Sequence, residues 1–527
     1  MNSPKCRTLL FRLIAAVFTV FIGMLAVMAV FIHCETNIYD YGHSKTITGH
    51  TPYLYLGLAV SGCAAVMLLC AFLERITVWA EECKKISRIV FFSCGAVIAL
   101  TGIFWIAFND EAPFYDQYNV YQEARRLAGA LDEPYDVGYF SVFHRNRGIA
   151  LAVAAAVGLF GDHLYSFQIL NLLAVLVIYY CISKGAGLLF HNPVIEMLTS
   201  FLLMLFYPLT VYMTFIYGTL LSIAFTSVGL YAAAAWQETG KIRYAVMLVI
   251  AFPLGILMHQ SAAIGLMAAA VYLLLDGRKG RLSQNIIIIV IAAGMVFGSM
   301  KAVNFIYTEI TGVPRDADSI PVTCTIYMGL TSTEGSGGPG SQDGSYGDIF
   351  VENNRDGAAA NRDAIQRILT VAEEYLTGER SLRFFLEKTE YQWLDPTFGA
   401  RKIIRMESVE EGTMAHAEAF TAFYNSPFRT LLFKLSIGGM LLLYCTALLT
   451  GGFAAYDVKK YPLMALFQLY IIGGSLFQLL WESLSRYCLG YYIWLIPMSA
   501  AGMYMLYRRC RDFLASREEK RFQKRKK

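Results

Sequence analysis

Long runs of apolar residues recur along the chain, and they constrain its fold more than any other feature. A helix of about 20 apolar residues spans the ~30 Å hydrocarbon core of a bilayer. In that medium, helices satisfy their own backbone hydrogen bonds. The runs predict an all-α polytopic membrane protein with about 12 transmembrane helices, over residues 10–32, 52–73, 89–108, 164–183, 194–213, 217–236, 243–258, 260–275, 284–303, 430–449, 462–481 and 487–507.

Composition supports this interpretation and excludes several classes of protein. Of the 527 residues, 56% are hydrophobic and 16% are charged, whereas soluble proteins have about 25% charged residues. A soluble globular enzyme, a disordered protein and a disulfide scaffold are therefore excluded. The formal net charge is only +4, so no nucleic-acid partner is expected.

Clusters of Lys and Arg orient the predicted spans, because cytoplasmic loops carry an excess of positive charge. The segments 74–88, 276–283 and 508–527 are basic. We therefore expect a multi-pass protein of the plasma membrane with both termini in the cytoplasm. The apolar run 149–160 would reach only about 18 Å as a helix. Counting it as a span would move the 276–283 loop outside, so we expect an interfacial helix on the outer face.

The largest polar region, 304–429, falls on the outer side in this topology. A linker of this length without secondary structure would be unusual, so we expect a small extracytoplasmic domain. Helical spacing of apolar residues predicts helices near 365–376 and 380–393. The Gly/Ser-rich stretch 329–347 is typical of a mobile loop.

Charged residues concentrate in the first long outer loop, which follows the third predicted span. A carboxylate can act as a general base toward a hydroxyl group, and cations can bind a phosphate. The loop could thus support a reaction between a lipid phosphate and a polar acceptor. The alternative is a solvated loop whose basic side chains anchor lipid headgroups. The candidate carboxylates are Asp110, Glu111 and Asp116, and the candidate cations are His144, Arg145 and Arg147.

Several segments together resemble a known family. They are the P-x-x-D-Q pattern at 113–117, YFSVFHRNRG at 139–148, LFGDHLYSFQILNLL at 159–173, TFIYGTLLS at 214–222 and WESLSRYCLGYYIWLIP at 481–497. Their order and spacing resemble the C-type (GT-C fold) membrane glycosyltransferases, in the superfamily of the protein O-mannosyltransferases and aminoarabinose transferases (glycosyltransferase family 39-like).

The resemblance implies a catalytic transmembrane module whose first outer loop carries the catalytic acid and interfacial helices. It implies a polyprenyl-phosphate-linked sugar as donor and a hydroxyl group of an extracytoplasmic glycan, lipid or protein as acceptor. The chain would then divide into two additional N-terminal helices (1–88), the GT-C-like module (89–303, with its loop 109–147), an extracytoplasmic domain (304–429), C-terminal transmembrane helices (430–507) and a basic cytoplasmic tail (508–527).

Asp116 matches the aspartate of the family's first-loop motif. The resemblance implies that it is the general base, which deprotonates the acceptor hydroxyl as it attacks the anomeric carbon. Asp110 and Glu111 compete for this role, because spacing alone does not exclude them. The sequence has no metal-ligand spacing, so no cofactor is expected, although these carboxylates could hold a divalent cation.

The leaving phosphate needs positive charge or hydrogen-bond donors around it. Lys301 could instead extend to the membrane surface, and Arg486 and Glu482, four residues apart, could pair on one helix face. Tyr217 could line the site or belong to an interfacial aromatic belt. The candidates for donor binding are His144, Arg145, Arg147, His259, Lys301 and Arg486, with Tyr217 and Glu482 as residues that line the substrate site.

Two other functions remain open. About 12 spans also suit a transporter or a flippase of lipid-linked glycans, although we find no internal repeat of the kind that transporters show. A polymerase or ligase of lipid-linked glycans would share the same membrane plan with a large outer loop.

Overall fold

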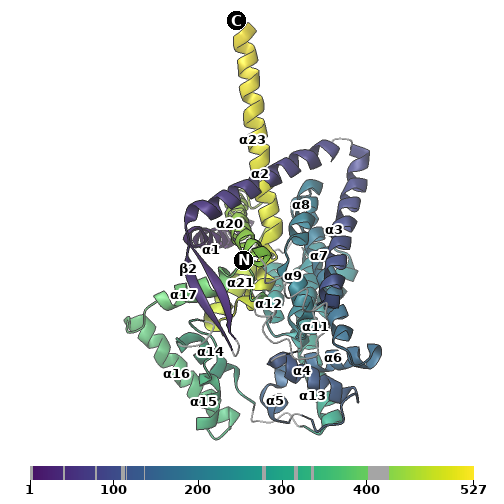
Figure 1. The fold of residues 1–527 in the computed structure, drawn as a ribbon, viewed down its shortest axis with the longest axis vertical. Coiled ribbons are helices and arrows are strands. Elements are labelled where there is room, and N and C mark those ends of the chain that lie inside the picture. The colour runs from purple at the N-terminus through teal and green to yellow at the C-terminus, as the bar shows by residue number, and fades with distance from the viewer. Residues whose placement is uncertain are drawn as a thin grey trace.

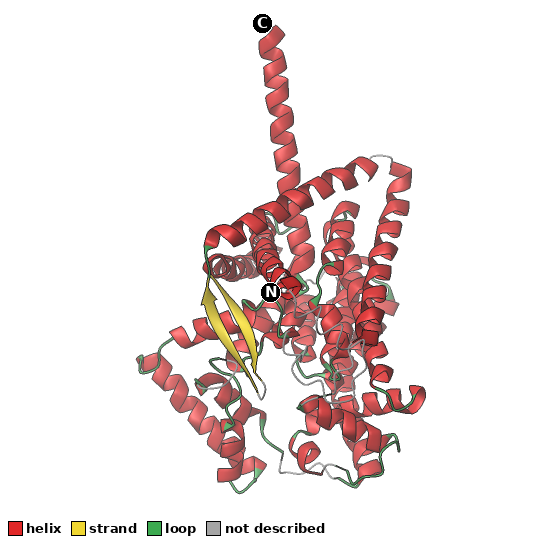
Figure 2. Ribbon diagram, in the orientation of Figure 1, coloured by secondary structure: helices red, strands yellow, loops and turns green. Residues whose placement is uncertain are grey.

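The computed structural model is a bundle of helices with one small sheet (Figures 1 and 2). It describes residues 4–39, 42–77, 80–108, 113, 115–135, 137–275, 280–313, 319–333, 338–400 and 427–526. Each predicted apolar run lies within a helix or a bent pair of helices, which confirms the helical membrane fold.

Within these ranges, seven helices are long and apolar enough to cross a membrane. They match seven of the predicted spans and are longer than predicted, because the helices continue into the polar flanks. They are α1 (Pro4–Phe31), α2 (Pro52–Thr77), α3 (Ala80–Phe108), α7 (Leu164–Phe190), α10 (Thr219–Thr239), α13 (Leu282–Thr311) and α20 (Pro427–Tyr456).

Two predicted spans are bent rather than continuous. α8 (Pro193–Met204) is followed by α9 (Pro208–Val211) and η2 (Tyr212–Thr214) at an angle of 51°. The break precedes Pro208, which lacks the backbone N–H that a continuous helix would use. The last span begins with η4 (Ser485–Cys488) and α22 (Leu489–Tyr492) and bends by 53° into α23 (Leu495–Lys526).

The three remaining predicted spans form shorter helices: α11 (Ile242–Met258), α12 (Ala262–Leu275) and α21 (Met464–Leu480). α12 has 14 residues and the other two have 17 each. By length and composition, the described helices that can cross a membrane thus number seven, or up to nine with the bent pairs. About 12 were predicted, because apolar runs mark spans without fixing where a helix ends.

The short apolar run lies in α6 (Arg147–Phe160), a helix of 14 residues. It belongs to a group with α4 (Asp116–Leu127), α5 (Val137–Val142) and η1 (His144–Asn146). α4 packs on α6 through Val120 and Ala124, which are fully buried. The predicted short helix is therefore present, while its place at the membrane surface stays a prediction.

A hairpin between the first two long helices was not predicted. β1 (Ile32–Tyr39) pairs antiparallel with β2 (Gly42–Gly49), with Ile32 opposite Gly49. The backbone N–H of Cys34 donates to the carbonyl oxygen of Leu394 at 2.9 Å. This contact ties the hairpin to the segment after α17, and the hairpin is an exception to the all-α description among the residues that the structure describes.

The polar region 304–429 contains α14 (Val322–Thr331), α15 (Ser345–Glu352), α16 (Gly357–Thr377) and α17 (Arg383–Trp393). α16 and α17 confirm the two predicted helices. α14, α15 and α16 share a small core that includes Cys324, Ile349 and Phe350.

The loop predicted over 329–347 is present in part: residues 329–331 belong to α14, residues 345–347 belong to α15, and the other described residues of the stretch form no helix or strand. Gly329 belongs to α14 and packs against the backbone of Leu480 and Trp481. The carbonyl oxygen of Gly340 accepts from the N–H of Ser483 at 2.8 Å, and Lys388 donates to the carbonyl of Gly329. Glycine thus serves close backbone packing here, while residues 334–337 lie outside the described part.

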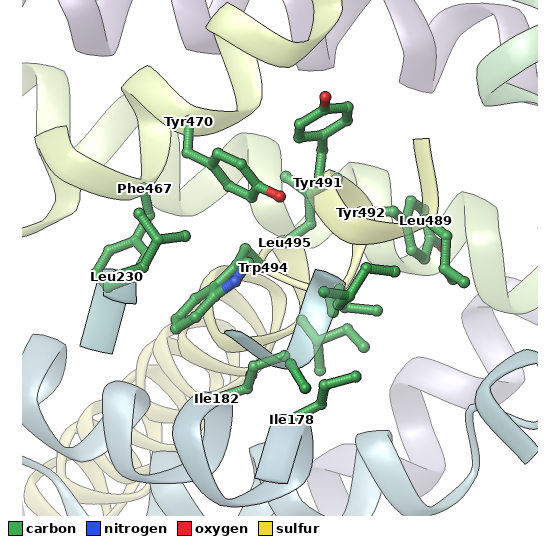
Figure 3. Packing of buried hydrophobic residues seen from close by; sticks show 14 of the residues in the cluster. Ile178, Ile182, Leu230, Phe467, Tyr470, Leu489, Tyr491, Tyr492, Trp494 and Leu495 are labelled. Carbon is green, nitrogen blue, oxygen red and sulfur yellow. The ribbon is translucent and has the colours of Figure 1, made fainter. Parts of the chain in front are cut away.

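The molecule is elongated and has two opposite ends (Figure 1). The C-terminal end of α23 and the junction of α2 with α3 lie at one end, and α4, α5, α15 and α16 lie at the other. Between them, Trp494 stacks on Phe467 at a ring distance of 4.3 Å, beside Tyr470 and Leu230 (Figure 3). The acidic loop region is therefore opposite the basic tail, as the charge pattern requires; which end faces the cytoplasm stays a prediction.

Candidate active site

Asp116 begins α4, directly after a backbone turn. Tyr115 adopts φ 49° and ψ −128°, a left-handed conformation that costs a bulky residue about 1–3 kcal/mol. The half-buried carboxylate of Asp116 accepts a hydrogen bond from the hydroxyl of Tyr139 at 3.0 Å. Strained backbone of this kind concentrates at functional sites.

A chain of hydrogen bonds continues from Asp116 into the molecule. The amide nitrogen of Asn146 donates to the hydroxyl of Tyr139 at 2.7 Å, and the hydroxyl of Tyr217 donates to the amide oxygen of Asn146 at 3.1 Å. Burial raises the pKa of Tyr217 to about 12, and the charge of Asp116 adds to this effect. Burial also raises the pKa of Tyr139. Both phenols therefore stay protonated and act as donors.

Positive charge lies beside this chain. The guanidinium of Arg486 lies 5.9 Å from the ring centre of Tyr217 and 5.6 Å from that of Phe215. The negative charge of Asp116 is close enough to interact with Arg486. Arg145, half-buried over Phe143 at 5.3 Å, also interacts with Tyr217. The site therefore brings the Asp116 carboxylate near two cations, and Glu482 is a second acidic neighbour of Arg486.

His259 joins the cluster from the turn between α11 and α12. Its ring centre lies 6.2 Å from that of Tyr217 and 5.6 Å from that of Tyr487. Desolvation, together with the charges of Arg486 and Arg145, lowers the pKa of His259 to about 3. His259 is therefore neutral at ordinary pH and can supply a hydrogen bond but not a positive charge.

Glu482 and Arg486 are linked, but not as the sequence suggested. α21 ends at Leu480 and η4 begins at Ser485, so the two residues do not share a helix face. Instead, the hydroxyl of Tyr487 donates to the Glu482 carboxylate at 3.2 Å and accepts from Arg486 at 3.4 Å. The predicted helical pairing is wrong, while the proximity of the two residues is confirmed.

Buried contacts fix the loop that carries Tyr217. The side-chain oxygen of Gln117 accepts from the backbone N–H of Ile216 at 2.8 Å. The amide of Asn171 donates to the carbonyl of Phe215 at 2.9 Å. Gly218 lies so close to the carbonyl oxygen of Met258 that a Cβ atom would sit 1.9 Å from it. Glycine is therefore required at this position.

Arg147 has different neighbours from Arg145. It is fully buried, donates to the carbonyl of Phe140 at 3.3 Å and to Asn304 at 3.4 Å, and lies over the ring of Tyr307 at 4.5 Å. These contacts join α6 to α5 and α13. They favour a packing role over phosphate binding.

The other predicted residues fall in three places. Lys301 is exposed on α13, over the ring of Phe297 at 4.5 Å, and lies outside the cluster. His144 begins η1 and is half-buried, two residues before Asn146. Asp110 and Glu111 lie outside the described residues.

Some polar residues of the cluster were not predicted from the sequence, and their side chains are uncharged. Tyr139 and Asn146 lie within the YFSVFHRNRG segment, Gln117 follows Asp116, and Tyr487 follows Arg486. In the sequence, they were distinguished only by lying within the segments that resemble the family. Because a neutral side chain is common in any loop, its part in the site depends on the fold.

The polar region 304–429 also contributes to the site. Tyr346 of α15 lies 6.3 Å from Phe143 between ring centres. Burial raises the pKa of Tyr346, and the charges of Glu482 and Asp116 add to the effect. One aromatic residue of α15 therefore lies beside the loop residues.

Within the described ranges, no group of three His, Cys, Asp or Glu side chains could hold a metal ion. This finding does not cover Asp110 and Glu111. A divalent cation in the first loop therefore stays a prediction.

Comparison with known proteins gives a structural similarity but no sequence match. No family model matches the chain, and no curated protein sequence matches it. Among solved structures, the chain is similar to the crystal structure of ArnT from Cupriavidus metallidurans bound to undecaprenyl phosphate. The identity is 13%, the match covers 81% of this chain and 78% of that chain, and the TM-score is 0.30. At this level of similarity, the functional assignment depends on the residues of this chain.

Proposed function

We propose that the chain is an integral membrane glycosyltransferase that moves a sugar from a polyprenyl-phosphate-linked donor to an extracytoplasmic hydroxyl. One observation carries the proposal: the half-buried Asp116 carboxylate is connected through Tyr139, Asn146 and Tyr217 to a region with Arg486. A base and a cation on either side of one polar cluster are what transfer from a phosphate to a hydroxyl needs.

Asp116 would act on the acceptor. Its carboxylate takes the proton of the acceptor hydroxyl as that oxygen forms a bond to the anomeric carbon. The bond between the anomeric carbon and the phosphate oxygen breaks, and the lipid phosphate leaves with the electron pair. Because attack and departure occur on opposite faces of the carbon, the configuration inverts. Tyr139 would hold the carboxylate in place through its 3.0 Å hydrogen bond.

Arg486 and Arg145 would stabilise the charge of the leaving phosphate. Neutral His259 would add a hydrogen bond. The N-termini of α10 and α12, at Thr219 and Ala262, follow Tyr217 and His259 closely in the chain, and helix N-termini attract anions through their free N–H groups. The two arginines, neutral His259 and the two helix N-termini would thus together favour the phosphate at this site.

The same geometry favours a transferase over a transporter. Transporter sites form near the bilayer midplane from interrupted helices. Arg486 does lie in a bent span, but Asp116 begins α4, which is not among the described helices that can cross a membrane, so the carboxylate does not come from an interrupted span. We therefore keep the transporter or flippase as the alternative, together with the lipid-linked glycan polymerase or ligase.

Transfer from a panel of polyprenyl-phosphate and polyprenyl-diphosphate sugars tests the proposal. We expect wild-type protein to use a monophosphate donor. Asp116→Asn should lower kcat by about 10²–10⁴-fold, the usual contribution of a general base. Glu133→Gln is the matched control, because Glu133 lies in the same loop region, is 56% exposed and pairs with Arg126. Its transfer rate should stay within about twofold.

Three results would count against the proposal. Full transfer by well-expressed Asp116→Asn would remove Asp116 as the base. Transfer from diphosphate donors alone would favour the polymerase or ligase. No transfer from any donor would favour the transporter. Accessibility labelling of Cys510 and of an introduced cysteine at Glu133 would test the proposed orientation, with termini in the cytoplasm and the site outside.

A further inference from the structure

A buried polar network joins the N-terminal hairpin to the residue before Arg486. Lys45 of β2 is only 8% exposed, and its ammonium donates to the hydroxyl of Ser485 at 2.9 Å and to the carbonyl of Tyr391 at 3.4 Å. Ser485 donates onward to the carboxylate of Asp395 at 2.7 Å. A cation and a carboxylate buried in this way are stable only as a connected set.

Asp395 organises the turn that follows α17. Its two carboxylate oxygens accept from the backbone N–H groups of Thr397 and Gly399, both at 2.9 Å. Phe398 and Gly399 have φ angles of 51° and 75°. The carbonyl of Phe398 then accepts from the hydroxyl of Tyr212 at 2.6 Å. Because η2 leads into the loop with Tyr217, the same turn contacts both segments that bear the site.

Arg486 depends on its backbone for its position. It lies in η4, a 3₁₀ segment of four residues, and such short segments hold themselves weakly. Its guanidinium lies near the rings of Phe215, Tyr217 and Tyr487, and its one described hydrogen bond is 3.4 Å long. Its Nε atom has no hydrogen-bond partner among the described residues.

We propose that Lys45 is a positioning residue, which acts through Ser485 and Asp395 to hold Arg486 at the phosphate-binding side of the site. The N-terminal hairpin then contributes to donor binding, although it lies outside the module 89–303. This inference rests on the proposed function, because it assigns Arg486 to the donor phosphate.

Loss of Lys45 should weaken donor binding more than it slows the chemical step. Ser485 would lose a charge-assisted hydrogen bond, and the buried carboxylate of Asp395 would lose a cation one hydroxyl away. η4 would shift, and Arg486 with it. The donor phosphate is already charged when it binds. Displacement of Arg486 should therefore raise KM before it affects kcat.

The experiment compares Lys45→Met with Lys45→Arg in the full-length protein. We expect Lys45→Met to raise the KM for the polyprenyl-phosphate sugar about tenfold, with kcat changed less than about threefold, and Lys45→Arg to restore part of the affinity. Lys184→Met is the matched control. Lys184 is partly buried and pairs with Glu196 at 2.5 Å near the junction of α7 with α8, so its loss likewise removes a hydrogen-bonded ammonium group. Its KM should stay within about twofold.

Binding of a sugar-free polyprenyl phosphate to the same variants separates the two hypotheses. We expect binding about tenfold weaker for Lys45→Met than for wild type or Lys184→Met. Unchanged KM and unchanged binding in Lys45→Met would overturn the positioning role, even if the yield of protein fell. If the wild-type protein bound the polyprenyl phosphate but transferred no sugar, the proposed reaction would be refuted. The comparison of binding between wild type and Lys45→Met would still test the positioning role of Lys45. Absence of both binding and transfer would overturn both proposals.

Discussion

Gly218 offers a direct test of the site, because the consequence of adding one methyl group can be worked out from distances. A Cβ atom on Gly218 would lie 1.9 Å from the carbonyl oxygen of Met258, and Cβ contacts under 3.0 Å essentially do not occur. The backbones must therefore separate by at least 1.1 Å (3.0 − 1.9). The φ of Gly218 is −67°, which alanine adopts freely, so the collision alone drives the change.

The separation falls between two site residues. Gly218 follows Tyr217 and Met258 precedes His259, whose ring lies 6.2 Å from that of Tyr217. A displacement of about 1 Å near reacting groups can cost about 10²-fold in rate. We expect Gly218→Ala to lower kcat/KM for sugar transfer by about 10–100-fold, and overpacking to lower the free energy of unfolding by about 1–3 kcal/mol.

Gly158→Ala is the control for this substitution. Gly158 is exposed within α6, and a Cβ atom there would meet nothing within 4 Å. Alanine in a helix is about 0.5–1 kcal/mol more favourable than glycine, so transfer should be unchanged and stability equal or higher. Transfer assays and thermal unfolding in detergent measure both effects. Equal transfer by folded Gly218→Ala and Gly158→Ala would show that the 215–218 and 258–261 segments do not form the site.

Two further predictions concern single residues of the site and its surroundings. Lys301→Met should leave the KM for the donor within about twofold, because Lys301 is exposed over Phe297; a large rise in KM would restore it as a phosphate ligand. The pKa of His259 is about 3 in the folded protein and 6.5 in its unperturbed state. Between these pH values, His259 should therefore take up a proton when the protein unfolds. Its contribution to stability is therefore present above pH 6.5 and lost as the pH falls toward 3. Between pH 7.5 and 5, Tm should fall more in wild type than in His259→Gln, and equal falls would contradict this.

The helical fold was predictable because apolar runs mark membrane helices independently of their neighbours. Breaks inside the runs were harder to predict. Both breaks had a proline as sequence signal, because Pro208 follows the first break and Pro497 lies in the first turn of α23 after the second. The hairpin was missed because its strands have mixed polar and apolar residues, and Cys34 finds its partner Leu394 far along the chain.

The site was predictable where a charge stood out against apolar sequence. Asp116, Arg145, His259 and Arg486 come from separate segments, and the fold places them in one cluster. Arg147 shows the limit of that reasoning. It stands two residues from Arg145, yet Arg145 lies in η1 whereas Arg147 begins α6 and turns into the packing with α13. Sequence spacing could not separate these two arginines, because their directions depend on one 3₁₀ turn.

The unequal lengths of the helices bear on how a lipid-linked donor could reach this site. At 1.5 Å per residue, the 14 residues of α12 reach only about 21 Å, against a hydrocarbon core of ~30 Å. If the basic 276–283 segment is held at the cytoplasmic surface, the other end of α12 lies roughly 9 Å below the outer surface. His259 stands at that end, beside Tyr217 and Arg486. A phosphate on a polyprenyl chain can enter this depth from the bilayer while its tail stays in lipid. A water-borne nucleotide sugar would first have to lose its hydration. The short helices therefore favour a lipid-linked donor, independently of the charges that line the site.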